Sequence, residues 1–274
     1  MTALHGSVQV ARLEAVKLAG QWRATVLLML CVAGPFVLVG ALALQSATPT
    51  DTLFGRWVHV SGLAVPLVVM GFAGQWAYPA IAGVVAADIF AAEDRHHTWK
   101  LILTRSRTRA EVFAGKTVTA LVFALLAVTL TLLSSVAAGL LVVGARPLLN
   151  LSGALVPPGE GLRLVVASAV TQLPPVLAMA AFALVLSVLT RNTLISLAGP
   201  VLLGLVSQLV ALADLPPLLR MVLPAGSFNA WRGLWLETPD TIPVAVGTAV
   251  SLLAVLIGVT VAAVVFCRRD VEVR

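Results

Sequence analysis

Six long stretches without a charged residue constrain this chain more than any other feature of its sequence. Each has at least 22 residues and is rich in Leu, Val and Ala: 24–50, 57–87, 117–145, 164–190, 192–213 and 241–267. About 20 apolar residues let a helix cross a bilayer with its backbone hydrogen bonds made internally. Membrane-spanning strands alternate apolar and polar residues instead, and these stretches are apolar on every face. The sequence therefore predicts helical membrane spans.

The composition agrees with a membrane protein. Only 11% of the 274 residues are charged and 59% are hydrophobic, whereas a soluble domain carries about 25% charged residues. We expect an all-α fold with one transmembrane domain over residues 1–274. Its six spans are expected at about 25–44, 58–87, 109–143, 164–190, 193–213 and 243–266.

The distribution of basic residues predicts the orientation. With six spans both termini lie on the same side. The pieces on that side carry 13 of the 18 Lys and Arg residues, and the pieces on the other side carry 5. Basic residues gather on the cytosolic side of membrane proteins. We therefore expect both termini in the cytosol and a multi-pass protein of the inner (plasma) membrane. The net charge of +6 reflects this topology and does not indicate nucleic-acid binding.

Local patterns predict how several segments begin and end. Residues 4–23 predict an amphipathic helix at the cytosolic interface, with an apolar stripe at Leu4, Val8, Ala11, Ala15, Leu18 and Trp22. The alternative is a plain basic anchor that only sets the topology. Thr108 and Glu111 form a capping box that starts the third span. Pro174 and Pro175 predict a kink or break in the fourth span.

The outer segment 214–242 contains four prolines and two Trp, which suits short helices in the outer leaflet. In the sixth span Ala254, Gly258 and Ala262 form a face for close helix packing.

Residues 110–117, AEVFAGKT, match a loose phosphate-loop pattern. A phosphate loop needs several glycines, a preceding buried strand and a following helix. Here Gly115 is the only glycine, the preceding residues are polar and basic, and the capping box places the helix start at Thr108. We therefore reject a nucleotide site, and interpret Lys116 as a side chain that snorkels toward the lipid headgroups.

The charge that the spans lack is concentrated beside this pattern. Nine of the 30 charged residues lie between Glu93 and Lys116. From Asp88 to Thr104 there is no Gly or Pro, and apolar residues such as Trp99 and Leu101 are interleaved with the charges. This pattern predicts a short cytosolic helix between the second and third spans, with apolar anchors for a partner. The alternative is a solvated loop that only sets the topology.

Residues 93–116 resemble the cytosolic loop of ABC-2 type permeases. In that family an acidic residue precedes a Gly-Thr pair, a Leu-rich run, Thr-x-Pro-x-x-Arg and a Gly-Lys pair. The chain has Glu93, then Thr98-Trp99-Lys100-Leu101-Ile102-Leu103-Thr104-Arg105-Ser106, Arg109 and Gly115-Lys116. His97 stands where the family usually has Gly, and Ser106 where it often has Pro. The six spans, the interfacial helix and the long outer segment also resemble the family, so the likeness covers nearly the whole chain.

The resemblance implies the membrane subunit of an ATP-driven exporter. Two such subunits, either two copies or a copy and a sister permease, each dock on a separate cytosolic ATPase subunit, which binds the ATP and Mg²⁺. The helix between spans two and three is then the coupling helix. The residues expected to contact the ATPase are Glu93, Asp94, Arg95, His97, Thr98, Trp99, Lys100 and Leu101. We expect no catalytic, cofactor or metal site in this chain. The uncharged spans suit an amphipathic or lipid-like substrate, such as a drug, peptide or natural product.

Two other classes compete with this interpretation. An ion-coupled secondary transporter usually needs ionisable groups within the membrane, and the six charge-free stretches contain no Asp, Glu, Lys or Arg. A membrane-embedded enzyme needs a nucleophile–base pair or a metal cluster, and the acids, histidines and two cysteines are scattered. An accessory membrane protein also remains open. A free-standing ATPase gene beside this one would favour the ABC interpretation.

Overall fold

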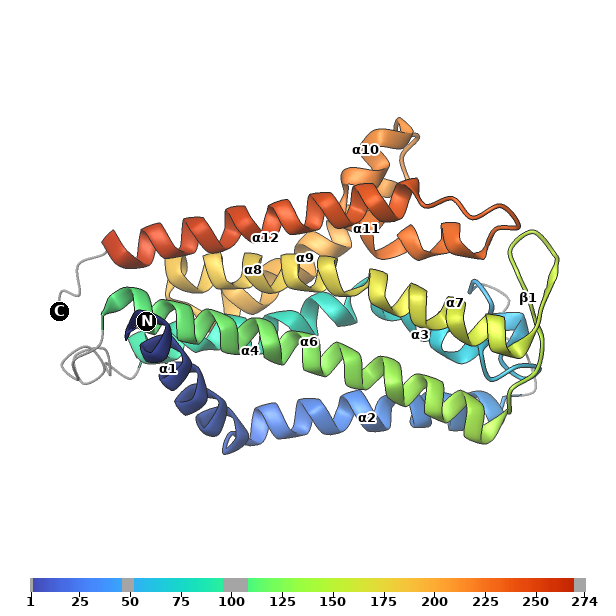
Figure 1. The fold of residues 1–274 in the computed structure, drawn as a ribbon, viewed down its shortest axis with the longest axis horizontal. Helices are drawn as coiled ribbons and strands as arrows, with labels where there is room; N and C mark the ends of the chain where they lie inside the picture. Colours follow the sequence, from blue (N-terminus) through green and yellow to red (C-terminus); the bar gives the residue numbers. More distant parts are fainter. Residues whose placement is uncertain (1, 46–51, 96–107, 269–274) are drawn as a thin grey trace.

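The long helices run roughly along one direction and form an elongated bundle (Figure 1). This computed structural model describes residues 2–45, 52–95 and 108–268. Helix α1 and the last turns of α12 lie at one end of the bundle, named here the α1 end. A hairpin of β1 and β2 lies at the other, named here the hairpin end. The described elements are α1 (Thr2–Ala19), α2 (Trp22–Ala43), η1 (Gly55–Trp57), α3 (Ala64–Ala73), α4 (Ala77–Arg95), α6 (Arg109–Val142), β1 (Leu148–Leu149), β2 (Leu155–Val156), α7 (Pro158–Thr171), α8 (Leu173–Thr190), α9 (Thr193–Ala211), α10 (Pro217–Val222), α11 (Pro224–Asn229), η2 (Ala230–Trp235) and α12 (Ile242–Arg268).

The helices are long and apolar enough to cross a membrane. Five segments of the described chain qualify, namely Trp22–Ala43, Arg109–Val142, Pro158–Thr190, Thr193–Ala211 and Ile242–Arg268. Helices α3 and α4 qualify together as a sixth, bent by 60° between Ala73 and Ala77. The predicted fold class is therefore confirmed: the chain is an all-helical, multi-pass membrane protein.

Helix α8 lies at the centre of the bundle, in contact with α4, α6, α9 and α12. Its Ala180, Ala181 and Ala183 are fully buried, and such small residues let neighbouring helix backbones approach closely. Gly258 of α12 faces this surface, since a β-carbon there would lie 3.2 Å from the β-carbon of Ala181. Of the predicted small-residue face, Gly258 therefore packs against α8 and Ala262 is buried, whereas Ala254 lies at the surface.

The bend between α3 and α4 was not predicted. Gly74 follows α3 and is packed tightly: a β-carbon there would lie 3.1 Å from the carbonyl oxygen of Met70 and 3.2 Å from the β-carbon of Phe228. Pro79 lies in the first turn of α4, where its missing N–H group costs no helical hydrogen bond. The span therefore bends where α11 presses on a glycine and where a proline opens a new helix.

The fourth span breaks beside Pro174 and Pro175, as these two residues predict. Gln172 separates α7 from α8, and its N–H group donates to the carbonyl of Ala169 in a tightened turn. Because Pro174 and Pro175 have no N–H group, the last carbonyls of α7 lose their helical donors. The axis nevertheless continues through the break, and Figure 1 shows α7 and α8 as one nearly continuous yellow segment.

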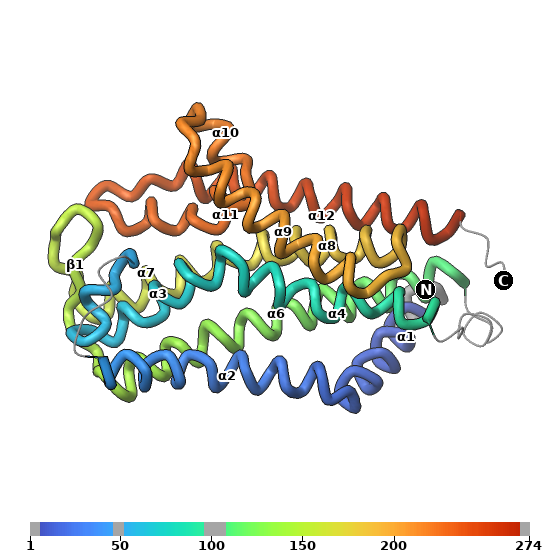
Figure 2. Tube along the Cα trace, turned by 180° about the vertical axis from the view of Figure 1, so that it is seen from behind, coloured from blue at the N-terminus to red at the C-terminus, as the bar shows by residue number. Residues whose placement is uncertain are grey.

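The segment after α9 contains the expected short helices, α10, α11 and η2. Figure 2 shows α9 leading away from the bundle to α10, which projects from its side. Leu212 and Leu218 are 83% and 70% exposed on this projection. The chain then returns through η2, whose Trp231 and Trp235 are fully buried beside Phe54. These buried aromatic side chains hold the hairpin end together.

Candidate functional site

The charged residues of α1, α4 and α6 meet at the α1 end of the bundle. The site includes the last turn of α4, which directly precedes residues 96–107 in the sequence. We name the four charged residues that meet there the ion cluster; they are Glu14, Lys17, Glu93 and Lys116.

Gly115 lets α1 reach α6. A β-carbon on Gly115 would lie 2.6 Å from the β-carbon of Val10 and 2.9 Å from the carbonyl oxygen of Ser7. Thr119, one turn later, donates its hydroxyl to the carbonyl of Gly115 at 2.9 Å and to that of Ala11 at 3.3 Å. The glycine of AEVFAGKT therefore serves helix packing. The predicted apolar stripe of α1 is divided, because Val8 stays 63% exposed while Ala11 is half-buried.

Lys116 is buried within the bundle, with 1% of its side chain exposed. Its ammonium group contacts Glu14 Oε1 at 2.8 Å, Glu93 Oε1 at 3.0 Å and the carbonyl oxygen of Ile89 at 3.0 Å. An ammonium group has three N–H donors, and within the described chain these three acceptors face it. The expectation that Lys116 snorkels to the headgroups is wrong, because two carboxylates and a carbonyl on facing helices compensate its charge within the bundle.

Lys17 completes the cluster from the surface. Its ammonium lies 2.5 Å from the same oxygen, Glu93 Oε1, and 48% of its side chain is exposed. Burial lowers the pKa of Lys17, but the hydrogen bond to Glu93 and the charges of Glu14, Glu93 and Asp88 outweigh it and leave that pKa raised. Within the described residues the cluster combines two cations with two anions, so these four charges compensate one another. Such compensation makes burial of Lys116 and Glu93 tolerable.

Ser187 of α8 enters the hydrogen-bond ladder of α4. Its hydroxyl donates to the carbonyl of Ala87 at 2.7 Å and accepts from the N–H group of Ala91 at 3.2 Å. Ala87 and Ala91 are four residues apart, the spacing of a hydrogen bond within a helix. The side chains of Ser187 and Lys116 thus hold the end of α4 from two neighbouring helices.

Two further contacts fasten the last turns of α4. Asp88 accepts a hydrogen bond from Thr193 at the start of α9 at 3.0 Å, and pairs with Arg95 at 3.2 Å. Phe90 stacks on Phe113 of α6 with ring centroids 5.6 Å apart and meets Phe266 of α12 at 5.3 Å. The end of α4 is therefore held by α1, α6, α8, α9 and α12 together.

The start of α6 is equally well defined. The hydroxyl of Thr108 accepts from the N–H group of Glu111 at 3.2 Å, and the Glu111 carboxylate accepts from the N–H group of Thr108 at 3.0 Å. The predicted capping box is confirmed. Because α6 continues unbroken to Val142, the N–H groups around Gly115 belong to the helix and cannot wrap a phosphate. The structure therefore agrees with rejecting the phosphate loop.

The residues expected to contact an ATPase fall into two groups. Glu93, Asp94 and Arg95 form the end of α4. Glu93 is 4% exposed and belongs to the ion cluster, Asp94 is half-buried, and Arg95 is exposed. His97, Thr98, Trp99, Lys100 and Leu101 lie outside the described residues, as does most of the expected helix 88–104.

The ion cluster itself was missed, since its members are distant in sequence. Lys116 lies 102 residues from Glu14, and Lys17 lies 76 residues from Glu93. The signal available in the sequence was the lysine itself, seven residues inside a helix whose start was already marked at Arg109. In the part of the chain that the structure describes, no group of three or more His, Cys, Asp or Glu is placed to hold a metal ion.

Residues 56–271 match the model of a protein family described as a protein of unknown function, DUF2705. The match covers more than half of the chain. The chain belongs to this family. None of the curated proteins compared with it matches. The DUF2705 match begins after α2 and includes all of the site except α1, so Glu14 and Lys17 lie outside it.

Proposed function

We propose that this DUF2705 protein is the membrane-spanning subunit of an ATP-driven transporter of the ABC-2 permease kind. A separate cytosolic ATPase would bind the ATP and Mg²⁺ and would dock on residues 88–104. The α1 end, where α1 begins and α12 ends, would face the cytosol, and the helices would cross the plasma membrane. Two permease subunits, identical or sister chains, would pair with two ATPase subunits and export an amphipathic or lipid-like substrate.

The observation that best supports this proposal is the way the two helices beside residues 96–107 are joined. Glu93 near the end of α4 and Lys116 in α6 form a buried ion pair at 3.0 Å. Phe90 and Phe113 stack between the same helices one turn away. In the proposed transporter these contacts would make α4 and α6 move together. A partner that moves when it binds ATP would tilt these helices and change access to the membrane interior.

Copurification tests the proposal. The tagged chain, expressed together with a free-standing ATPase encoded beside its gene, should retain that ATPase through purification. Replacing both Trp99 and Leu101 by Ala should release the ATPase, because buried aromatic and aliphatic anchors dominate interfaces. The matched control replaces Leu252 and Leu256, both exposed on α12, by Ala and should leave copurification unchanged. If the ATPase stays bound to the Trp99 and Leu101 double variant, the coupling role is refuted.

A second candidate, an ion-coupled secondary transporter, is favoured by one observation. Ionisable groups buried among membrane helices often carry coupling ions, and Lys116 and Glu93 are buried. The two charges neutralise each other, however, and sit at one end of the bundle beside the half-exposed Lys17. Transport that persists after ATP depletion but stops with a protonophore would favour this second candidate over the first.

A further inference from the structure

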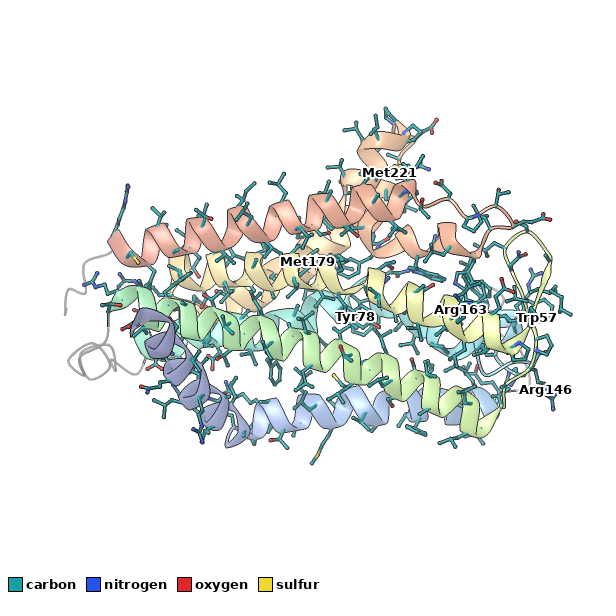
Figure 3. All side chains as sticks on the ribbon, in the orientation of Figure 1. Trp57, Tyr78, Arg146, Arg163, Met179 and Met221 are labelled. Atoms are coloured by element: carbon teal, nitrogen blue, oxygen red, sulfur yellow. The ribbon has the colours of Figure 1, made fainter. Side chains whose placement is uncertain are left out.

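A cavity of about 410 Å³ lies between α8, α9, α11 and α12, away from the ion cluster. Its volume falls in the range of roughly 300–1,000 Å³ that is usual for small-molecule sites. Met179 of α8 forms part of its wall, is 2% exposed and lies near the middle of the bundle (Figure 3). The cavity is therefore at the depth of the membrane.

The chemistry of the wall is almost entirely apolar. Ser227 of α11 and Ser251 of α12 are its two polar side chains, and each is 3% exposed. The Ser227 hydroxyl donates a long hydrogen bond, 3.4 Å, to the carbonyl of Gly247. The hydroxyl of Ser251 has no hydrogen-bond partner within the described chain. None of the described residues that line the cavity is ionisable. A ligand there meets two hydroxyl groups and a long apolar surface.

The cavity is open on its side. Leu203 of α9 and Ile257 and Val261 of α12 line it, yet they remain 38%, 54% and 40% exposed. In a membrane-spanning bundle such exposed apolar side chains face lipid. The wall extends along α12 from Val250 to Val261, about 16 Å at 1.5 Å per residue. An alkyl chain of medium length can therefore enter sideways from the bilayer and lie along α12.

We propose that this cavity binds a neutral, single-chain amphiphile. The alkyl chain lies against α8 and α12, and a hydroxyl-bearing head group bonds to Ser251 and Ser227. A charged head group is disfavoured, because no opposite charge in the wall compensates its loss of water. The site goes beyond the transporter proposal and needs no ATPase, so the two can fail separately.

Photolabelling tests the site. The purified chain is placed in nanodiscs of zwitterionic phospholipid with a monoacylglycerol that carries a diazirine in its chain. We expect saturable labelling of α8 and α12 that excess unlabelled monoacylglycerol removes. A diazirine-bearing fatty acid, which has the same chain and a charged head, should label the same peptides at least ten times less efficiently.

Two matched substitutions on neighbouring residues locate the ligand. Ala254→Phe fills the cavity from α12 and should reduce labelling at least tenfold. Leu253→Phe adds the same ring outside the cavity and should leave labelling unchanged. Ser251→Ala should weaken monoacylglycerol binding about fivefold, the effect of one hydrogen bond of about 1 kcal/mol.

Two results would overturn the proposal. One is labelling spread evenly over α2 and α12 without saturation, which indicates surface lipid only. The other is equal labelling of the Ala254 and Leu253 variants. Should the Ala254 variant fail to fold, the saturation and head-group comparisons in the unmodified protein still decide between a site and surface lipid.

Discussion

Replacing Lys116 by Met should destabilise this protein much more than replacing Lys17 by Met. The substitution keeps most of the side-chain volume and removes the ammonium group that Glu14 and Glu93 both contact. Breaking a buried ion pair by removing one partner costs about 3–5 kcal/mol, because the other charge is left uncompensated. Glu93 retains Lys17, but that lysine is 48% exposed, and exposed pairs contribute about 0–1 kcal/mol. We therefore expect the lower end of the range, about 3 kcal/mol.

Thermal unfolding in detergent, followed by intrinsic fluorescence, measures this effect. At 2–4 °C per kcal/mol, Lys116→Met should lower the Tm by roughly 6–12 °C. Lys17→Met is the matched control, because it removes the same charge from the same carboxylate at a half-exposed position; its Tm should fall by roughly 4 °C at most. Adding Glu93→Gln to Lys116→Met should restore about 1–3 kcal/mol, since it removes a buried carboxylate that is left with the half-exposed Lys17 as its cation.

Comparing the loss of stability in Lys116→Met with that in Lys17→Met shows how much burial of the ammonium group contributes. If Lys116→Met costs no more than Lys17→Met, burial of the ammonium group contributes nothing and the ion cluster is only a surface network. If Glu93→Gln adds its own loss to that of Lys116→Met, the two residues are not coupled. Loss of nucleotide binding without loss of stability would restore the phosphate-loop interpretation of AEVFAGKT.

Three further predictions concern the packing of α1, a buried hydroxyl and the titration of Lys17. Gly115→Leu should displace α1, because the new side chain meets Val10, and should expose Arg12 and Lys17 to trypsin; Gly40→Leu, at a position with nothing within 4 Å, should not. Tyr78→Phe should raise the free energy of unfolding by about 1 kcal/mol, because the fully buried hydroxyl has no hydrogen-bond partner within the described chain, and equal or lower stability would contradict this. Because the pKa of Lys17 is raised in the folded state, its stabilising contribution should be complete below its ordinary value of 10.5 and lost as the pH rises through the folded value. The stability difference between Lys17→Met and the unmodified protein, measured by chemical unfolding, should therefore stay constant from about pH 7 to pH 9 and shrink only at higher pH.

Features of this fold that depend on local chemistry could be predicted from the sequence. The absence of charge over 22 or more residues predicts helices, because a membrane satisfies no backbone hydrogen bond. The cap at Thr108 and the break beside Pro174 follow from groups within four residues of each other. The bend at Gly74 could not be predicted in this way, since it depends on contact with Phe228. The same holds for the ion cluster, whose partners lie up to 102 residues apart. The helix expected over 88–104 lies mostly outside the described residues and stays a prediction.

Two of the nine charged residues in the stretch 93–116, Glu93 and Lys116, act within the bundle as partners in the ion cluster. The Glu93 carboxylate accepts from Lys17 of α1 and Lys116 of α6 through one oxygen, so a single residue of α4 joins three helices. If either lysine moved away with its helix, Glu93 would be left less well compensated within the bundle, which is costly. The cluster therefore makes separate movements of α1, α4 and α6 unfavourable and a joint movement inexpensive. In the proposed transporter, force applied between α4 and α6 would consequently reach α1 as well, and Glu14→Gln should loosen α1 from that movement while leaving the pair of Glu93 and Lys116 in place. Cross-linking α1 to α6 through cysteines at Val10 and Ala114, in a variant that lacks Cys31 and Cys267, tests this. The efficiency should fall when Glu14→Gln is added. Unchanged cross-linking would show that the contact of Glu14 with Lys116 is not needed to hold α1, and that the packing at Gly115 and the pair of Lys17 and Glu93 suffice.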